Sequence, residues 1–315
     1  MRAPEFWTRR GWESAALAPA AALFDTAGRI KRALATPWRA PVPVVCVGNL
    51  TVGGAGKTPV VLALAQALGV NVHLLTRGYG GSLAGPVRVD PARHDFRAVG
   101  DEPLLLARAA PTWVARDRAA GAKAAVAAGA GLILMDDGLQ NPSLRQDLRL
   151  IVVDGGYGFG NGRVLPAGPL REDLRRGLAR VHGAILVGDD RAGAGARLAG
   201  LPMARARLAP RNEIAGRVLA FAGIGRPRKF FETLEAIGAE LVERVGFPDH
   251  HPYGAAEIEA LLARAEALRA TPVTTAKDAI RLPPGLRERV AVLEIELAWA
   301  SVADEAAIMD LLTRL

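Results

Sequence analysis

A short glycine-rich segment carries the clearest chemical signal in the sequence. Residues 53–59 read Gly-Gly-Ala-Gly-Lys-Thr-Pro, after the apolar run 44–47 and before a stretch of helical pattern. Glycines between a buried strand and a helix start direct several backbone N–H groups into one concavity, where the helix dipole adds partial positive charge. Phosphate is the group that such a loop holds.

The residues after the glycines fit a nucleoside triphosphate. The segment follows G-x-x-x-x-G-K-[ST], except that Thr51 replaces the first glycine. Lys57 would reach the β- and γ-phosphates, and the Thr58 hydroxyl would bind Mg²⁺. Pro59 is tolerated because the first helical turn has no intrahelical N–H bond to lose. We predict a nucleotide site formed by Gly53, Gly54, Ala55, Gly56, Lys57, Thr58 and Pro59.

A second motif supplies carboxylates. The apolar run 132–135 ends at Asp136 and Asp137, and Gly138 then turns the chain. In α/β folds ligands bind at the carboxyl ends of the strands, and adjacent carboxylates repel each other unless a cation or proton compensates. We therefore predict that this pair holds Mg²⁺; a simple helix cap is the alternative.

Phosphoryl transfer to an alcohol also needs a general base, whereas hydrolysis needs only a positioned water. Two segments offer candidates: VGDEP with Asp101 and Glu102, and FPDHHPY with Asp249, His250 and His251. An Asp and a His from different domains would form a base and its orienting partner when a cleft closes. The residues alone leave open that Asp101 merely caps a helix.

Alternating apolar and helix-like segments indicate the fold that positions these motifs. The apolar runs lie at 41–49, 70–75, 131–137, 148–154 and 183–190, separated by stretches of helical length. Such alternation is typical of a parallel sheet covered on both faces. We predict an α/β fold, with a P-loop domain built on a doubly wound, mostly parallel sheet.

The pattern loosens near residue 191 and resumes on a smaller scale, with a strand at 290–297 and a last helix at 302–314. We predict three parts: an N-terminal amphipathic helix at 1–40, a P-loop nucleotide-binding domain at 41–210, and a smaller C-terminal α/β domain at 211–315.

The N-terminal part combines two kinds of side chain. Apolar residues recur at helical spacing at Leu23, Ala27, Ile30, Leu34 and Trp38. Basic residues accompany them at Arg29, Lys31, Arg32 and Arg39. This combination suits a helix in the interface of an anionic membrane, where each basic residue contributes roughly 1 kcal/mol. A helix packed on the core is the alternative.

Composition narrows the class of protein. Lys and Arg number 40 against 32 Asp and Glu, and the net charge of +8 suits an anionic partner, although a bias towards Arg would produce the same excess. The single Cys46 excludes an internal disulfide and favours a reducing compartment. No stretch reaches the ~20 apolar residues of a membrane span, and the N-terminus lacks a signal-peptide pattern. We expect a cytoplasmic monomer without a nucleic-acid partner.

A set of motifs, taken together, resembles one family. GNLTVGGAGKTP, LTRGYGG, VGDEP, MDDGLQN, GNGRVLPAGPLRE, FAGIGRPRKFFETL, FPDHHPY and TTAKD occur in the order seen in the tetraacyldisaccharide 4'-kinases, the lipid A 4'-kinases of Gram-negative bacteria. The resemblance extends to about residue 282. It implies ATP- and Mg²⁺-dependent phosphorylation of the 4'-hydroxyl of a tetraacylated glucosamine disaccharide 1-phosphate, giving lipid IVA. It also implies membrane contact through the N-terminal helix, at the cytoplasmic face of the inner membrane.

The resemblance assigns roles to single residues. Lys57 and Thr58 take the phosphate and metal roles, and Asp136 and Asp137 the Walker B role. Asp101 with His250 forms the base dyad, with His251 as the alternative to His250. In PLRE, Arg171 and Glu172 would be a phosphate group and a metal ligand, and Arg118 is a further phosphate candidate. Surface salt bridges are the alternative for these last three.

The sequence departs from the family pattern at two positions. Asn141 stands where the family usually has His, which excludes proton transfer there but keeps hydrogen bonding. Ala276 stands where the family usually has Glu, beside Lys277 and Asp278. Neither departure touches the proposed dyad or the glycine loop.

Other functions share a glycine loop of this kind. A kinase of a soluble metabolite would act without lipid and without residues 1–35. A partitioning or metal-insertion ATPase would respond to a partner protein or to DNA. A nucleotide-binding membrane adaptor would leave Asp101 and His250 without a role.

Overall fold

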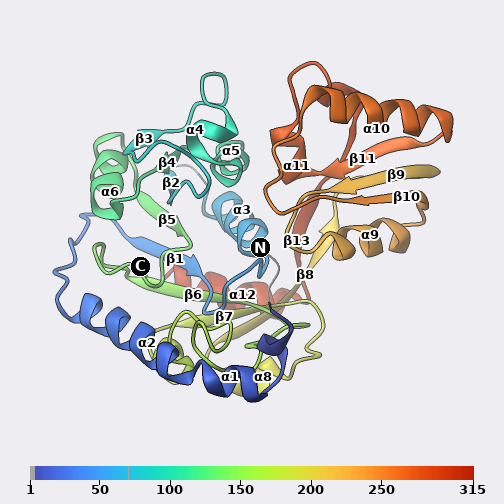
Figure 1. The fold of residues 1–315 in the computed structure, drawn as a ribbon. Coiled ribbons are helices and arrows are strands. Elements are labelled where there is room, and N and C mark those ends of the chain that lie inside the picture. Colours follow the sequence, from blue (N-terminus) through green and yellow to red (C-terminus); the bar gives the residue numbers. More distant parts are fainter. Residues whose placement is uncertain (1–3, 70) are drawn as a thin grey trace.

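The computed structural model describes residues 4–69 and 71–315, which form two α/β units side by side (Figure 1). The larger unit is built on a nine-stranded sheet and the smaller on a four-stranded sheet. In Figure 1 the smaller unit, coloured orange, lies to the right of the larger one.

The large sheet has the strand order β13-β8-β7-β6-β1-β5-β2-β4-β3. In chain order its strands are β1 (Val44–Gly48), β2 (Val72–Thr76), β3 (Val87–Arg88), β4 (Thr112–Val114), β5 (Leu132–Asp136), β6 (Leu148–Asp154), β7 (Gly183–Val187), β8 (Met203–Pro210) and β13 (Ile295–Trp299). Only the edge pairs β3·β4 and β13·β8 are antiparallel. The predicted doubly wound, mostly parallel sheet is therefore confirmed.

The central strand shows why the apolar runs are continuous. All five residues of β1 are buried, and their side chains alternate between two cores. Cys46 lies in the core under α6 (Arg118–Ala127), while Val45 and Val47 lie in the core under α3 (Lys57–Leu68). Because each face is covered by helices, both sets of alternating side chains must be apolar.

The shorter helices of the large unit connect these layers. They are α4 (Phe96–Val99), α5 (Asp101–Leu106), α7 (Leu174–Leu178) and α8 (Ala194–Leu198).

The small sheet is parallel, in the order β10-β9-β11-β12. Its elements are β9 (Arg217–Ala222), α9 (Pro227–Ala236), β10 (Glu240–Gly246), α10 (Ala255–Ala267), β11 (Thr271–Thr275), α11 (Ala276–Arg281), η2 (Arg287–Arg289) and β12 (Ala291–Leu293). Two apolar clusters fill its faces, one around Phe221 and the other around Phe230. α11 packs against α5 of the large unit and thereby closes the two units on each other.

The predicted C-terminal boundary at 211–315 is wrong, because the chain returns to the large unit. The predicted strand 290–297 is divided at Glu294: β12 belongs to the small sheet, and β13 pairs with β8 with Ile295 opposite Pro210. The last helix, α12 (Val302–Leu312), buries Ile308 and Leu312 in the core of the large unit. The apolar pattern continues across the break, so nothing local marks the crossing.

The N-terminal part consists of η1 (Glu5–Thr8), α1 (Trp12–Ala16) and α2 (Ala18–Ala33). Residues 1–3 of the predicted helical part lie outside the described residues. The long helix α2 ends before Trp38, which instead forms a backbone bridge to Leu144 and packs on the large core. The spacing therefore placed Trp38 wrongly on the helix, since Pro37 precedes it and the residue before a proline avoids the helical region.

The surface of α2 is unusual for a helix packed on a core. Leu23, Ile30 and Leu34 are 73%, 54% and 79% exposed. Among the residues that the structure describes, no helix has both the length and the apolar character needed to span a bilayer.

Candidate nucleotide and phosphoryl-transfer site

The glycine loop joins β1 to α3 and leaves the start of the helix open. Gly53 and Gly56 adopt φ values of 106° and 84°, which side chains other than glycine rarely adopt. A Cβ on Gly53 or Gly54 would meet no atom within 4 Å. No side chain caps the N-terminus of α3, so the N–H groups of its first turn can be bound by a ligand. The loop therefore has the shape predicted for a phosphate site.

Lys57 and Arg171 converge on Asp137. The Lys57 Nζ lies 3.5 Å from Asp137 Oδ2, and Arg171 donates to both oxygens of Asp137 at 2.8 and 3.0 Å. Burial alone would raise the pKa of Asp137, but the two cations and their hydrogen bonds outweigh it and lower the pKa below its usual range. Asp137 thus stays ionised and holds the cations of Lys57 and Arg171 beside the loop.

Asp136 has a different environment from its neighbour. It is buried, and its Oδ1 has no hydrogen-bond partner among the described residues. Burial, with the charge of Glu102, raises the pKa of Asp136 well above the usual carboxyl range, although Lys57 opposes this effect. A buried carboxylate oxygen without a partner is the type of group that a cation satisfies.

Glu102 lies between Thr58 of the large unit and Lys277 of the small unit. The Thr58 hydroxyl donates to Glu102 Oε1 at 3.5 Å, and Lys277 of α11 forms an ion pair with the same oxygen. The sequence indicated Glu102 only as a possible base. No single motif shows its position beside Thr58, because the two lie 44 positions apart, and its other partner, Lys277, lies in the small unit.

These oxygen donors fit Mg²⁺. Across residues 4–69 and 71–315, no three His, Cys, Asp or Glu side chains converge in a way that holds a metal ion by themselves. Mg²⁺ bound with a nucleotide commonly uses one or two carboxylates, with water and phosphate as the other ligands. Thr58, Asp136 and Glu102 supply such a partial set.

The two segments that offered a general base meet across the units. His250 Nδ1 lies 3.0 Å from Asp101 Oδ2, although the two residues are 149 positions apart. Asp101 is only 3% exposed. Its other oxygen accepts the Glu102 N–H at 2.9 Å. Asp101 is the first residue of α5, whose N-cap is Gly100 and has no side-chain cap. Asp101 therefore faces His250 with its second oxygen and is not the helix cap that the sequence left open.

The electrostatics of the pair favour the charged forms. Burial alone would raise the pKa of Asp101, but the hydrogen bond and charge of His250, with Arg281 and Lys277, lower it below 3.8. The hydrogen bond to Asp101 raises the pKa of His250 above 6.5, and burial only partly opposes this. At neutral pH Asp101 is an ionised acceptor beside a readily protonated imidazole.

A buried network holds Asp101 in place. Arg281 Nε lies 3.4 Å from Asp101 Oδ2, and the same guanidinium donates to Asp278 and to the Gly223 carbonyl at 2.8 and 3.0 Å. Tyr253 donates to Asp278 at 2.8 Å. The TTAKD motif thus contributes support for the dyad, which sequence analysis did not predict.

His251 points elsewhere. Its Nε2 lies 2.7 Å from Glu257 Oε2, and its ring stacks on Phe247 with centroids 4.8 Å apart. The structure therefore brings His250, and not His251, to Asp101. The catalytic role of the pair stays a prediction.

Two other predicted residues occupy places that differ from their expected roles. Glu172 contacts Gln140, Arg180 and Arg32, and it does not lie with the oxygen donors Thr58, Asp136 and Glu102. Arg118 is buried at the start of α6 and donates to the Ala115 carbonyl, so it does not present its guanidinium to the loop. Both differences have one cause. A short motif gives the residue types, but it does not show which distant residues bind each side chain.

The two departures from the family pattern are locally accommodated. Asn141 accepts hydrogen bonds from the backbone and hydroxyl of Ser143 at 3.0 and 2.9 Å, and so shapes its own turn. Ala276 opens α11, and the adjacent Lys277 still reaches Glu102. The hydrogen-bonding role left open for Asn141 is therefore used within its loop.

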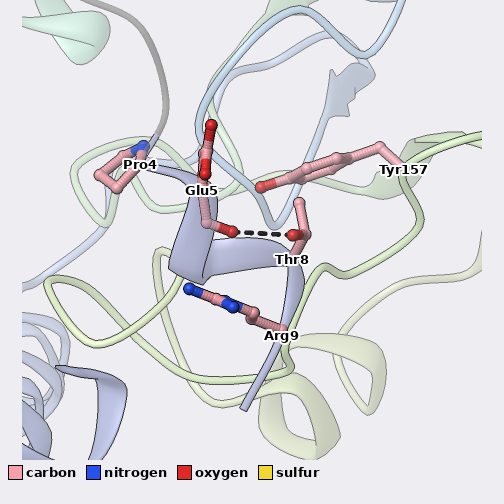
Figure 2. A pocket seen from close by; sticks show the side chains of 5 residues that line it. All are labelled: Pro4, Glu5, Thr8, Arg9 and Tyr157. Carbon is pink, nitrogen blue, oxygen red and sulfur yellow. Dashed lines mark hydrogen bonds between the residues drawn. The ribbon is translucent and has the colours of Figure 1, made fainter. Parts of the chain in front are cut away.

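A second contact joins the units near the N-terminus. Asp154, at the end of β6, forms ion pairs with Arg226 and Lys229 at 2.6 and 2.7 Å. The Arg226 guanidinium also lies 5.0 Å above the ring of Tyr157. A pocket of about 440 Å³ is lined by Pro4, Glu5, Thr8, Arg9 and Tyr157. Figure 2 shows these five side chains.

Known proteins are similar to this chain over most of its length. Residues 13–314 match the family model described as tetraacyldisaccharide-1-P 4'-kinase. A tetraacyldisaccharide 4'-kinase of Rhodospirillum centenum is 58% identical over 95% of this chain and 93% of its own. That of Gluconacetobacter diazotrophicus is 54% identical over 99% and 98%.

A solved structure resembles the whole fold. It is described as the "apo" form of LpxK from Aquifex aeolicus in complex with ATP, and its sequence is 26% identical. The TM-score is 0.78, with 96% of this chain and 98% of that chain covered.

Proposed function

Because this chain belongs to the tetraacyldisaccharide-1-phosphate 4'-kinase family, we propose that it transfers the γ-phosphate of ATP to the 4'-hydroxyl of a tetraacylated glucosamine disaccharide 1-phosphate, giving lipid IVA. One observation carries the proposal: Asp101 of the large unit and His250 of the small unit are in contact, 3.0 Å apart. A transfer enzyme needs such a proton acceptor, whereas a switch or motor does not.

The acceptor oxygen loses its proton to Asp101. The low pKa of Asp101 keeps it ionised, and the hydrogen bond from His250 fixes one carboxylate oxygen in place while its charge stabilises the ionised form. As the sugar oxygen approaches the γ-phosphorus, its proton moves to Asp101, and the hydrogen bond from His250 keeps the carboxylate oriented during the transfer.

The loop side stabilises the transferred group. Backbone N–H groups of the first turn of α3, with Lys57 and Arg171, lie where negative charge on the phosphates would be bound. Mg²⁺, held by Thr58, Asp136 and Glu102, would neutralise further phosphate charge when the nucleotide is bound.

The N-terminal helix provides the membrane contact in this proposal. The exposed apolar side chains of α2, with Trp12 at 78% exposure, stand beside exposed Arg29 and Lys31. Apolar and basic groups of this kind bind an anionic interface. The protein would then act as a peripheral monomer at the cytoplasmic face of the inner membrane, where its lipid substrate is embedded.

The direct test is product formation. The protein is incubated with γ-labelled ATP, Mg²⁺ and the detergent-solubilised disaccharide 1-phosphate lipid, and a doubly phosphorylated lipid is expected. Labelled water-soluble products in place of lipid, or label released only as inorganic phosphate, would contradict the proposal. Omitting Mg²⁺ in the presence of a chelator should abolish transfer.

Membrane binding is tested separately by flotation with vesicles containing phosphatidylglycerol. Replacing both Leu23 and Ile30 by Asp should release the protein from the vesicles, because each change places a charge in the apolar face. The same variant should keep its affinity for ATP, since these side chains are exposed and far from the loop in sequence.

A further inference from the structure

One short segment touches both the N-terminal helix and the phosphate site. Arg171 pairs with Asp137 beside the glycine loop. The next two residues face the other way: Glu172 pairs with Arg32 from α2, and the backbone N–H of Asp173 donates to Asp25 of α2 at 3.3 Å. Successive residues of the segment therefore serve two sites.

Gln140 closes the gap between these contacts. Its amide nitrogen donates to Glu172 Oε1 at 3.0 Å, and its amide oxygen accepts from Arg171 NH1 at 3.4 Å. A side-chain amide provides a donor and an acceptor at one place. A carboxylate at this position would repel Glu172, and an aliphatic side chain would bind neither neighbour.

The chain of contacts is continuous from the helix to the loop. Arg32 NH2 lies 3.6 Å from Glu172 Oε2, Arg171 binds Asp137 through two hydrogen bonds, and Lys57 lies 3.5 Å from Asp137. The Glu172 side chain is 1% exposed, whereas those of Arg32 and Asp137 are 22% and 31% exposed, so the chain of contacts is buried in its middle and reaches solvent towards both ends. Buried hydrogen-bonded charges have few alternative partners. Arg180 also pairs with Glu172 Oε2, so loss of Arg32 should weaken the contacts less than loss of Gln140, which joins Glu172 to Arg171.

We propose that Arg32, Glu172 and Gln140 form a positioning relay, through which the placement of α2 sets how Arg171 and Lys57 meet the phosphates of ATP. Arg32 and Gln140 are positioning residues in this account, because they act through Arg171. The inference rests on the proposed function where it takes α2 as the membrane contact. It predicts that the affinity for ATP depends on the position of α2 against the large unit.

The test measures ATP binding to the full-length protein by calorimetry, without lipid. Gln140→Leu should weaken ATP binding by about 5- to 10-fold and Arg32→Gln by about threefold, which is the size of a typical coupling between sites. The double variant should bind ATP about as weakly as Gln140→Leu alone, because both changes break the same relay. Arg29→Gln is the matched control on the same helix and should bind ATP like the unchanged protein.

Steady-state kinetics in mixed micelles supply a second readout. The variants should raise KM for ATP with little change in kcat, because a misplaced cation weakens binding before the acid–base pair is affected. Thermal melts check that each variant is folded. The Arg32 side chain is partly exposed, so Arg32→Gln tests the relay even if Gln140→Leu unfolds.

Two results would overturn the relay. One is an ATP affinity of the double variant equal to the product of the separate effects, which would make the residues independent. The other is an Arg32→Gln protein that loses vesicle flotation while binding ATP normally, which would make α2 an anchor only. Failure of lipid phosphorylation by the unchanged protein would instead count against the proposed function, since calorimetry needs no lipid.

Discussion

Two of the contacts that join the units differ in the chemistry of their cations. Asp101 faces His250 and the buried Arg281, whereas Asp154 faces Arg226 and Lys229, whose side chains are 37% and 58% exposed. His250 can gain or lose a proton near neutral pH, but Arg226 and Lys229 keep their charge. The comparison separates a contact suited to proton transfer from one suited to holding the units together.

The largest expected effect comes from removing the carboxylate at the first contact. Asp101→Ala should lower kcat by roughly 10²- to 10⁴-fold with little change in ATP affinity, because the base acts only on the acceptor hydroxyl. Initial rates with the lipid substrate and calorimetry with ATP measure the two quantities. An unaltered turnover number would remove Asp101 from the role of base.

Replacing the imidazole should cost less. His250→Gln keeps a hydrogen-bond donor beside Asp101 but removes the positive charge, so kcat should fall by roughly 10²-fold or less. His251→Gln is the control of equal size, and it should leave kcat near that of the unchanged protein because His251 binds Glu257. Equal losses in the two variants would contradict the assignment.

Near neutral pH the first contact should respond to pH and the second should not, because only the first contains an imidazole; at acid pH the lowered pKa of Asp154 makes the second contact respond as well. The pKa of His250 is raised, so its stabilising contribution is complete below 6.5 and is lost as pH rises through the raised value. The pKa of Asp101 is lowered, so its contribution is present above 3.8 and is lost as pH falls through the lowered value. The ion pair is therefore strongest between these limits.

NMR titration of the His250 ring measures this directly. Its pKa should lie above 6.5 in the unchanged protein and should fall in Asp101→Asn, because the hydrogen bond and charge that raise it are removed. Asp154→Asn should leave the titration unchanged. A His250 pKa that does not respond to Asp101→Asn would show that the two side chains do not interact in solution.

The smallest effect is expected at the second contact. Asp154→Asn should lower the free energy of unfolding by about 1 kcal/mol, since its cations are partly exposed and can turn to solvent. Urea denaturation measures this loss, and kcat should stay near its original value. A large loss of kcat would mean that this contact also orients the reacting groups.

Sequence reasoning reached the site residues that lie within short motifs. The glycine loop and the Asp136 and Asp137 pair follow from residue types whose spacing is fixed by one strand end or one turn. The pairing of Asp101 with His250 across the units was expected instead from the resemblance to the family. Glu102 with Lys277, and Arg281 behind Asp101, were missed because each partner comes from the other unit. The local spacing of residues along the chain does not indicate contacts between the two units.

The fold was predictable at the centre of the large sheet but not at its edge. Buried parallel strands produce continuous apolar runs, so the large sheet was foreseen from its central strands. The edge strand β13 was not, because a half-buried strand after Glu294 has the same local pattern in either sheet. The choice between sheets is made by tertiary packing of α12, which burial of Ile308 and Leu312 decides.

The pairing of Pro210 with Ile295 has a topological consequence. The chain leaves the large sheet at the end of β8 and re-enters it at the start of β13, which is the neighbouring strand. The small unit is therefore an insertion between two strands that otherwise form a β-hairpin. A tight turn in place of residues 211–294 would restore that hairpin and leave every strand of the nine-stranded sheet with its neighbours. The glycine loop would then belong to a separate large unit that lacks the small unit and its His250.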